Sequence, residues 1–68
     1  MSSEKVVKSD DIIAGDELHI TVDGESYWAK ITFRSRSKQG TRVKVNLPNG
    51  NELEIAIPWD EKRLIRRR

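Results

Sequence analysis

Six basic residues and no acidic residue lie between Glu25 and Glu52, so this stretch is suited to binding an anion. Lysine and arginine side chains neutralise phosphates, and an exposed aromatic ring beside them can stack on a nucleic-acid base. Trp28 lies near the start of the stretch, and three consecutive arginines follow it at the end of the sequence. The candidate nucleic-acid-binding residues are therefore Trp28, Lys30, Arg34, Arg36, Lys38, Arg42, Lys44, Arg66, Arg67 and Arg68.

Charge is distributed unevenly along the 68 residues, although the net charge is only +2. Residues 1–25 carry two basic and seven acidic side chains, whereas residues 26–68 carry eleven basic and four acidic ones. One interpretation is a bipolar surface of mixed charge that keeps the protein soluble. The other is a basic face that binds an anionic ligand or is covered by the acidic N-terminal residues.

Residues suited to catalysis or metal binding are few. The chain has no cysteine and one histidine, so a thiolate or histidine-based zinc site is not expected. The carboxylate pairs Asp10-Asp11 and Asp60-Glu61 are adjacent in sequence and fit a tail and a turn better than a metal site. The sequence has no glycine-rich phosphate loop and no nucleophile-base pair. It therefore predicts a binding module that is not an enzyme and uses no metal or cofactor.

A chain of 68 residues can form one small domain, which buries roughly 60% of the surface of the unfolded chain. Residues 1–11 are polar and have no hydrophobic period, so we expect a flexible N-terminal arm there and a folded domain with a basic C-terminal tail over residues 12–68. The longest apolar run is far shorter than the roughly 18 residues of a membrane span, and the N-terminus has no apolar signal core. We expect a cytoplasmic or nucleoid-associated protein that is neither secreted nor bound to a membrane.

Residues 26–38 predict one long strand with one buried and one exposed face. Apolar residues occupy odd positions, whereas the even positions are mostly polar or charged, which is the period of two that a strand shows. The apolar positions are Tyr27, Ala29, Ile31 and Phe33. On the exposed face, Trp28 is expected beside His19 of the preceding strand, which spans residues 17–22. Its ring either stacks on a base or is covered by a terminal segment, for example by Ile12 and Ile13.

The pair Asp23-Gly24 predicts a two-residue type I′ turn between these strands, because both central residues of this turn have positive φ. Closing this turn brings apolar residues of the two strands to the same face of the sheet. The expected pairs are Val22 with Glu25, Ile20 with Tyr27, Leu18 with Ala29, and Glu17 with Lys30.

Two further loops determine the remaining registers. Lys38-Gln39-Gly40 predicts a three-residue loop with Gly40 in the left-handed conformation, and Pro48-Asn49-Gly50 predicts another three-residue loop. The expected pairs are Ser35 with Val43, Phe33 with Val45, and Ile31 with Leu47 across the first loop, and Val45 with Leu53 and Val43 with Ile55 across the second.

The first of these registers also sets Arg36 opposite Arg42, and Arg34 opposite Lys44. Like charges in such cross-strand pairs repel by up to about 1 kcal/mol. A surface that repels itself in this way suggests an anionic ligand. The alternatives are that the long arginine side chains spread into water or that the acidic N-terminal residues fold over them.

The C-terminal residues are expected to complete the sheet. Pro58 ends the fourth strand, and Trp59-Asp60-Glu61 predicts a single helical turn before a short strand around residues 64–65. Trp59 is expected to plug the core, and Ile12 and Ile13 are expected to pack against it. The predicted fold is all-β and consists of a small, strongly bent, five-stranded SH3-like barrel over residues 12–68.

Several short motifs in residues 15–65 resemble those of a Tudor domain. These motifs are Gly15-Asp16, Tyr27-Trp28-Ala29-Lys30-Ile31, Val43-Lys44-Val45, Asn49-Gly50-Asn51-Glu52 and Lys62-Arg63-Leu64-Ile65. The resemblance implies a Tudor-like barrel, which agrees with the strand pattern.

The Tudor family is best known for an aromatic cage that captures methylated lysine or arginine. Tyr27 and Asn51 match the family's cage tyrosine and asparagine. The other cage positions correspond to Val22, Asn46 and Asn49, none of which is aromatic. A cation must be surrounded by several ring faces to be held after desolvation, so the cage is incomplete and a methylated ligand is not expected.

Two functions therefore remain from the sequence. One is binding of DNA or RNA through the basic outer face with little sequence specificity. The other is protein interaction or self-association, for example a homodimer in which the acidic N-terminal residues of one copy meet the basic face of another.

Overall fold

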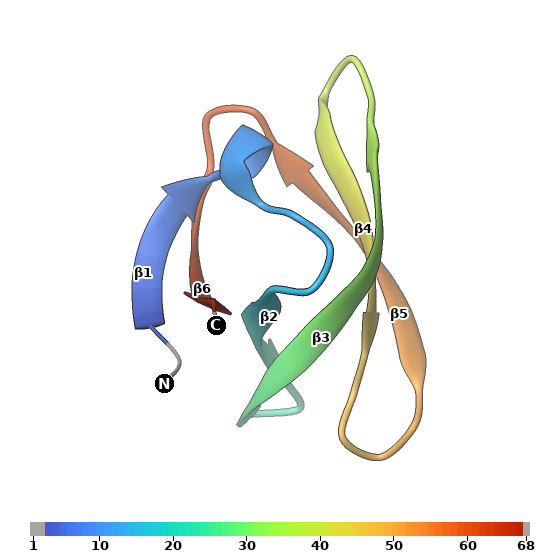
Figure 1. Ribbon diagram of the computed structural model, residues 1–68. Coiled ribbons are helices and arrows are strands. Elements are labelled where there is room, and N and C mark those ends of the chain that lie inside the picture. Colours follow the sequence, from blue (N-terminus) through green and yellow to red (C-terminus); the bar gives the residue numbers. More distant parts are fainter. Residues whose placement is uncertain (1–2, 68) are drawn as a thin grey trace.

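The computed structural model places six antiparallel strands in one bent sheet over the described residues 3–67, and the central strands show alternating apolar residues (Figure 1). The elements are β1 (Ser3–Lys8), the 3₁₀ turn η1 (Ser9–Asp11), β2 (Glu17–Val22), β3 (Glu25–Arg36), β4 (Gly40–Asn46), β5 (Glu52–Pro58) and β6 (Lys62–Arg67). The strand order is β1-β6-β2-β3-β4-β5, and the sheet is not closed into a barrel. No helix in residues 3–67 is long and apolar enough to cross a membrane.

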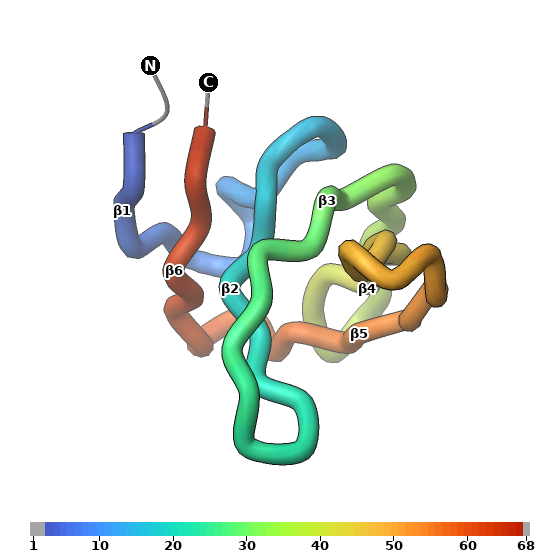
Figure 2. Tube along the Cα trace, turned by 90° about the horizontal axis from the view of Figure 1, so that it is seen from below, coloured from blue at the N-terminus to red at the C-terminus, as the bar shows by residue number. Residues whose placement is uncertain are grey.

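Residues 3–8 form strand β1, where the sequence led us to expect a flexible arm. Strand β1 pairs with β6 along its whole length, with Val6 opposite Leu64, and the two strands run side by side in Figure 2. Five of the six β1 residues are exposed, because β1 lies at the edge of the sheet. An edge strand needs no hydrophobic period, so the polar sequence of residues 3–8 gave no sign of a strand. The all-β class is confirmed, but the sheet has six strands rather than the five expected.

The β2–β3 hairpin has the predicted turn and register. Asp23 and Gly24 have φ values of 52° and 81°, as a type I′ turn requires. All the expected pairs form, including Leu18 with Ala29 and His19 with Trp28.

The β4–β5 hairpin also forms as predicted. The amide of Leu47 donates to the carbonyl of Asn51 at 2.8 Å, and Gly50 has a φ of 92°. This three-residue loop sets Val45 opposite Leu53. Val43 lies opposite Ile55, which completes the expected register.

The β3–β4 register differs from the prediction because of a β-bulge at Thr32. Ile31 lies opposite Val45 and Phe33 lies opposite Lys44, so Thr32 has no partner residue on β4. A bulge of one residue reverses the alternation of side chains for the rest of the strand. Phe33 therefore points away from the core and is 53% exposed.

The predicted pairs between the bulge and the β3–β4 loop are also wrong, because this loop has two residues and not three. Arg34 lies opposite the buried Val43, and Arg36 lies opposite the buried Thr41. The expected pairs of Arg36 with Arg42, Arg34 with Lys44 and Phe33 with Val45 do not form, nor do the pairs of Ser35 with Val43 and Ile31 with Leu47. The repulsion inferred from facing like charges is therefore absent.

The β3–β4 loop is one residue shorter than expected. Ser37 donates its backbone N–H to the carbonyl of Gly40 at 2.8 Å, so only Lys38 and Gln39 connect the two strands. Gly40 does not adopt a positive φ. Its lack of a side chain matters for another reason, since a Cβ here would collide with the backbone carbonyl of Ile57.

The core fills the concave side of the sheet. Its buried residues are Ile12, Leu18, Ile20, Ala29, Ile31, Val43, Val45, Ile57 and Ile65. Ile12 packs there as expected, but Ile13 is 45% exposed. Trp59 does not fill the core as expected, since it is 37% exposed. Its ring lies at the β3–β4 loop, where the indole N–H donates to the carbonyl of Lys38 at 3.0 Å.

We predict that Gly40→Ala destabilises the fold, because the added methyl group overlaps the β5 backbone. The expected loss is about 1–3 kcal/mol in the free energy of unfolding. Urea denaturation measures it, and Gln39→Ala in the exposed loop serves as the control with a change within about 0.5 kcal/mol. Equal stability of the two variants would show that the close approach of β4 and β5 is not required.

Candidate nucleic-acid interface

One row of mostly charged residues crosses the whole outer side of the sheet, where the side chains point away from the core. Residues that face each other on neighbouring strands share a side of the sheet. From β1 to β5, this row contains Glu4, Arg66, Glu17, Lys30, Asn46 and Glu52. Because acidic and basic residues alternate along it, this row is largely charge-compensated.

Arg66 is held inside this row and is not a free cation. Its guanidinium donates to both carboxylate oxygens of Glu17, at 3.1 and 3.0 Å. Hydrogen bonding to Glu17 raises the pKa of Arg66 above its ordinary value. The guanidinium carbon also lies 4.5 Å from the centroid of the Trp28 ring system.

Trp28 is therefore half-buried under Arg66 and does not offer a free surface for a base. On the same side of the sheet, the ring of His19 meets Trp28 edge-on at a centroid distance of 5.2 Å. The predicted neighbour is present, but the two rings and Arg66 form a packed cluster.

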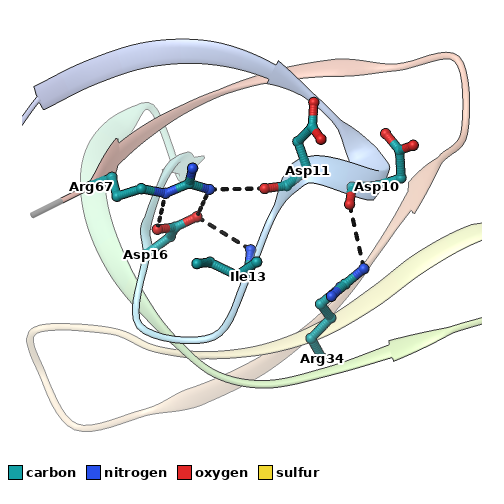
Figure 3. A network of polar contacts seen from close by, with 6 residues as sticks. All are labelled: Asp10, Asp11, Ile13, Asp16, Arg34 and Arg67. Atoms are coloured by element: carbon teal, nitrogen blue, oxygen red, sulfur yellow. Dashed lines mark hydrogen bonds and ion pairs between the residues drawn. The ribbon is translucent and has the colours of Figure 1, made fainter.

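Arg67 is part of a structural network around Asp16 (Figure 3). Its guanidinium donates to the two carboxylate oxygens of Asp16 at 2.8 and 2.7 Å, and to the carbonyl of Asp11 at 2.8 Å. The backbone N–H of Ile13 donates to the same carboxylate at 3.2 Å. Arg67 therefore ties β6 to the turn before β2. Arg68 lies outside the described residues.

Asp16 is 1% exposed, so its charge depends on these donors. Burial alone would raise its pKa, but the hydrogen bonds from Arg67 and Ile13 outweigh burial and hold the pKa of Asp16 below its ordinary value of 3.8. The backbone carbonyl of Asp16 also accepts the N–H of Ile31 at 2.8 Å, immediately before the bulge. The network thus joins β6, the turn before β2 and β3.

The bulge places Arg34 and Arg36 on the inner side of the sheet. Arg34 donates to the carbonyl of Asp10 at 3.4 Å, and its buried Nε has no hydrogen-bond partner within residues 3–67. The guanidinium of Arg36 lies 5.8 Å from the Trp59 ring centroid, at the end of the hairpin. Neither arginine belongs to the outer basic face that the sequence predicted.

Of the other basic residues predicted to bind nucleic acid, Lys30, Arg42 and Lys44 lie on the outer side of the β3–β4–β5 part of the sheet. We call this surface the β3–β5 face, and it consists of Lys30, Phe33, Ser35, Arg42, Lys44, Asn46, Glu52, Glu54 and Ala56. Lys44 lies with its ammonium 5.7 Å from the Phe33 ring centroid. Arg42 forms an exposed ion pair with Glu54 at 3.4 Å. Lys38 is exposed in the adjoining loop.

Two hollows lie along the β3–β5 face. One, of about 80 Å³, is lined by Phe33, Ser35, Arg42, Val43, Lys44 and Glu54. The other, of about 330 Å³, lies between the β3–β4 loop and β5 and includes Gly40, Ala56 and Pro58. Arg42 borders both hollows, so they adjoin on the same face.

Phe33 is the functional candidate that the sequence analysis missed, because simple alternation placed it in the core. A signal was present in the turn lengths. A two-residue loop at Lys38 and Gln39 pairs Ser37 with Gly40. From there to the apolar pair Ile31–Val45, β3 has one residue more than β4, so β3 must contain a bulge.

The two residues that match cage positions of the Tudor family lie together in a separate cavity of about 430 Å³. Tyr27 and Asn51 line it, together with Val22 and Asn49 from the other cage positions. Tyr27 donates its hydroxyl to Glu25 at 2.6 Å, and this hydrogen bond raises the pKa of Tyr27. Tyr27 is the aromatic residue of the lining, so the cavity offers a single ring face.

Comparison with protein-family models, curated proteins and solved structures finds no match to this chain. Within residues 3–67, no three side chains of histidine, cysteine, aspartate or glutamate are grouped so that they could hold a metal ion.

We predict that Arg67→Lys destabilises the fold by about 1–2 kcal/mol, because lysine cannot donate two parallel hydrogen bonds to Asp16. Arg63→Lys is the matched control, since Arg63 pairs with the more exposed Glu61 through one contact at 2.9 Å. Its expected cost is below about 0.5 kcal/mol. Urea denaturation at neutral pH compares the two, and equal losses would contradict the structural role of Arg67.

The contribution of Asp16 to stability should depend on pH. Because the pKa of Asp16 is lowered in the folded state, its stabilising effect is complete above the ordinary value of 3.8 and is lost as the pH falls through the folded-state pKa. Asp16→Asn should therefore be much less stable than the wild type at pH ~7, with a difference that shrinks below pH ~4. Urea denaturation over this pH range tests it, with Asp60→Asn as an exposed control. A difference that stays constant with pH would contradict the prediction.

Proposed function

We propose that this protein is a non-catalytic module that binds nucleic acid through the β3–β5 face, with little sequence preference. The observation that carries the proposal is the grouping of Arg42 and Lys44 around the exposed ring of Phe33. Cations beside an aromatic surface suit the phosphates and bases of nucleic acid. This interface is smaller than the set of residues expected from the sequence.

The charge balance of the β3–β5 face supports modest binding. Lys30, Arg42 and Lys44 are its cations, while Glu52 and Glu54 are its carboxylates. The adjoining β3–β4 loop adds Lys38. About three phosphate contacts are therefore within reach, and weak binding at physiological salt follows from so small a number.

We propose further that the strands β2 to β6 correspond to the SH3-like, Tudor-like arrangement suggested by the sequence motifs. Four consecutive antiparallel strands followed by a turn at Pro58 and a last strand support this. The turn is closed by the N–H of Glu61, which donates to the carbonyl of Pro58 at 3.0 Å. Strand β1 is then an addition at the edge beside β6.

Self-association is a second candidate, supported by the two open edges of the sheet. Strands β1 and β5 each have a single strand neighbour. Val6 on β1 is 61% exposed, and an edge strand with exposed apolar residues can pair with another chain. Sedimentation equilibrium without nucleic acid tests this, because self-association raises the apparent mass with protein concentration.

We predict salt-dependent binding to short oligonucleotides. With about three phosphate contacts, log affinity should fall against log salt with a slope of about −2 to −3. Lys44→Gln should weaken binding and flatten the slope by about one unit. Glu54→Gln should strengthen binding, because it releases Arg42 from its ion pair and removes a negative charge from the face.

Lys62→Gln is the control for these charge changes. Lys62 lies on β6, separated from β4 in the sheet by β2 and β3, so its loss should leave the slope unchanged. Fluorescence anisotropy titrations at several salt concentrations measure all the variants. Absence of binding at low salt, or an equal effect of Lys44→Gln and Lys62→Gln, would overturn the proposed interface.

A further inference from the structure

We propose that Phe33 is a base-stacking position and that the module therefore prefers single-stranded nucleic acid over duplex. This inference rests on the proposed function and assigns the ligand class to the β3–β5 face. It depends on three observations: the bulge that exposes Phe33, the cations around the ring, and the hollow that continues beside it.

The bulge gives Phe33 an orientation that the core alone would not favour. Burying a phenylalanine is among the larger gains available to a small domain, yet this ring is 53% exposed. The hydroxyl of Thr32 donates to the carbonyl of Lys44 at 3.3 Å, which helps to hold the extra residue in place. Bulges often re-aim a side chain next to a functional site, and here the redirected side chain is aromatic.

The surroundings of Phe33 suit a nucleotide. The Lys44 ammonium lies 5.7 Å from the ring centroid, and Arg42 lines the same hollow, where it forms its exposed ion pair with Glu54. Lys44 is exposed and has a flexible chain, so its ammonium can move from the ring to a phosphate when a base takes its place. Phe33 then supplies stacking and the two cations supply charge.

The neighbouring hollow offers a route for the rest of the strand. Its outer-side residues Gly40, Ala56 and Pro58 are small or compact, and Arg42 borders it on the side of Phe33. A flexible sugar-phosphate backbone can cross such a floor from Phe33 toward Lys38. Several nucleotides would therefore contact the face, in the range of site sizes of small single-strand-binding domains.

Stacking on Phe33 requires a base whose face is free. Bases inside a duplex are stacked on their neighbours and present only their edges in the grooves. Unpaired bases can be splayed out and placed on an aromatic ring. The geometry thus favours single strands, although phosphate contacts alone allow some duplex binding.

A comparison of two strands with the same charge tests this inference. The probes are fluorescent oligothymidylate of about 10 nucleotides and an abasic strand of the same length, which keeps every phosphate but has no bases. Phe33→Ala should weaken binding of oligothymidylate by roughly 5- to 150-fold and leave the abasic strand unaffected. Phe33→Trp should retain binding of oligothymidylate. Val6→Ala truncates an exposed apolar residue on β1 and should change neither affinity.

The outcomes separate the stacking position from the proposed function. If both strands bind the wild type with the same salt slope but Phe33→Ala has no effect, or weakens both strands equally, the stacking position is overturned and the cationic interface stands. If neither strand binds at low salt, both proposals are overturned. Circular dichroism of each variant checks that the fold is retained, which the exposure of Phe33 leads us to expect.

Discussion

The β-bulge at Thr32 is the constraint on which the rest of the structure depends. Strand β3 pairs with β2 over its first half and with β4 over its second, so it must bend where it changes partner. Ile31 is held at this point from the β2 side, because its N–H donates to Asp16 at 2.8 Å and its carbonyl accepts the N–H of Gly15 at 2.9 Å. The extra residue follows at once and reverses the faces of the strand. Both the extent of the core and the composition of the outer face are therefore determined here.

The uneven charge of the sequence has a structural explanation in ion pairs between distant segments. The acidic residues Asp16 and Glu17 lie in and before β2, and they pair with Arg67 and Arg66 of β6. A buried or half-buried ion pair of this kind stabilises the fold only when both partners are present, since loss of one partner leaves the other charge desolvated and unpaired. The basic C-terminal residues 66 and 67 thus stabilise the fold, and they leave the β3–β5 face as the candidate site for an anion.

The sequence predicted the parts of the fold that turn chemistry specifies. Gly24 and Gly50 need positive φ, and these positions fix the registers of the β2–β3 and β4–β5 hairpins. The bulge at Thr32 has no comparable composition signal, so the exposure of Phe33 was missed. The β3–β4 register was missed because of this bulge and because the loop has two residues and not three. Strand β1 was missed because an edge strand exposed to water carries charged residues in place of a hydrophobic period.

The charged residues and the proline of the two edge strands bear on the choice between the two candidate functions. Strand β5 carries Glu52 and Glu54 and ends at Pro58, which has no N–H to donate to a further strand. Strand β1 carries three charged residues among its six. Charges and proline on edge strands oppose pairing with another chain, so the open edges of this sheet are protected. The β3–β5 face has no such protection at Phe33, where an aromatic ring is exposed beside Lys44. This contrast favours binding across the face over association through the edges.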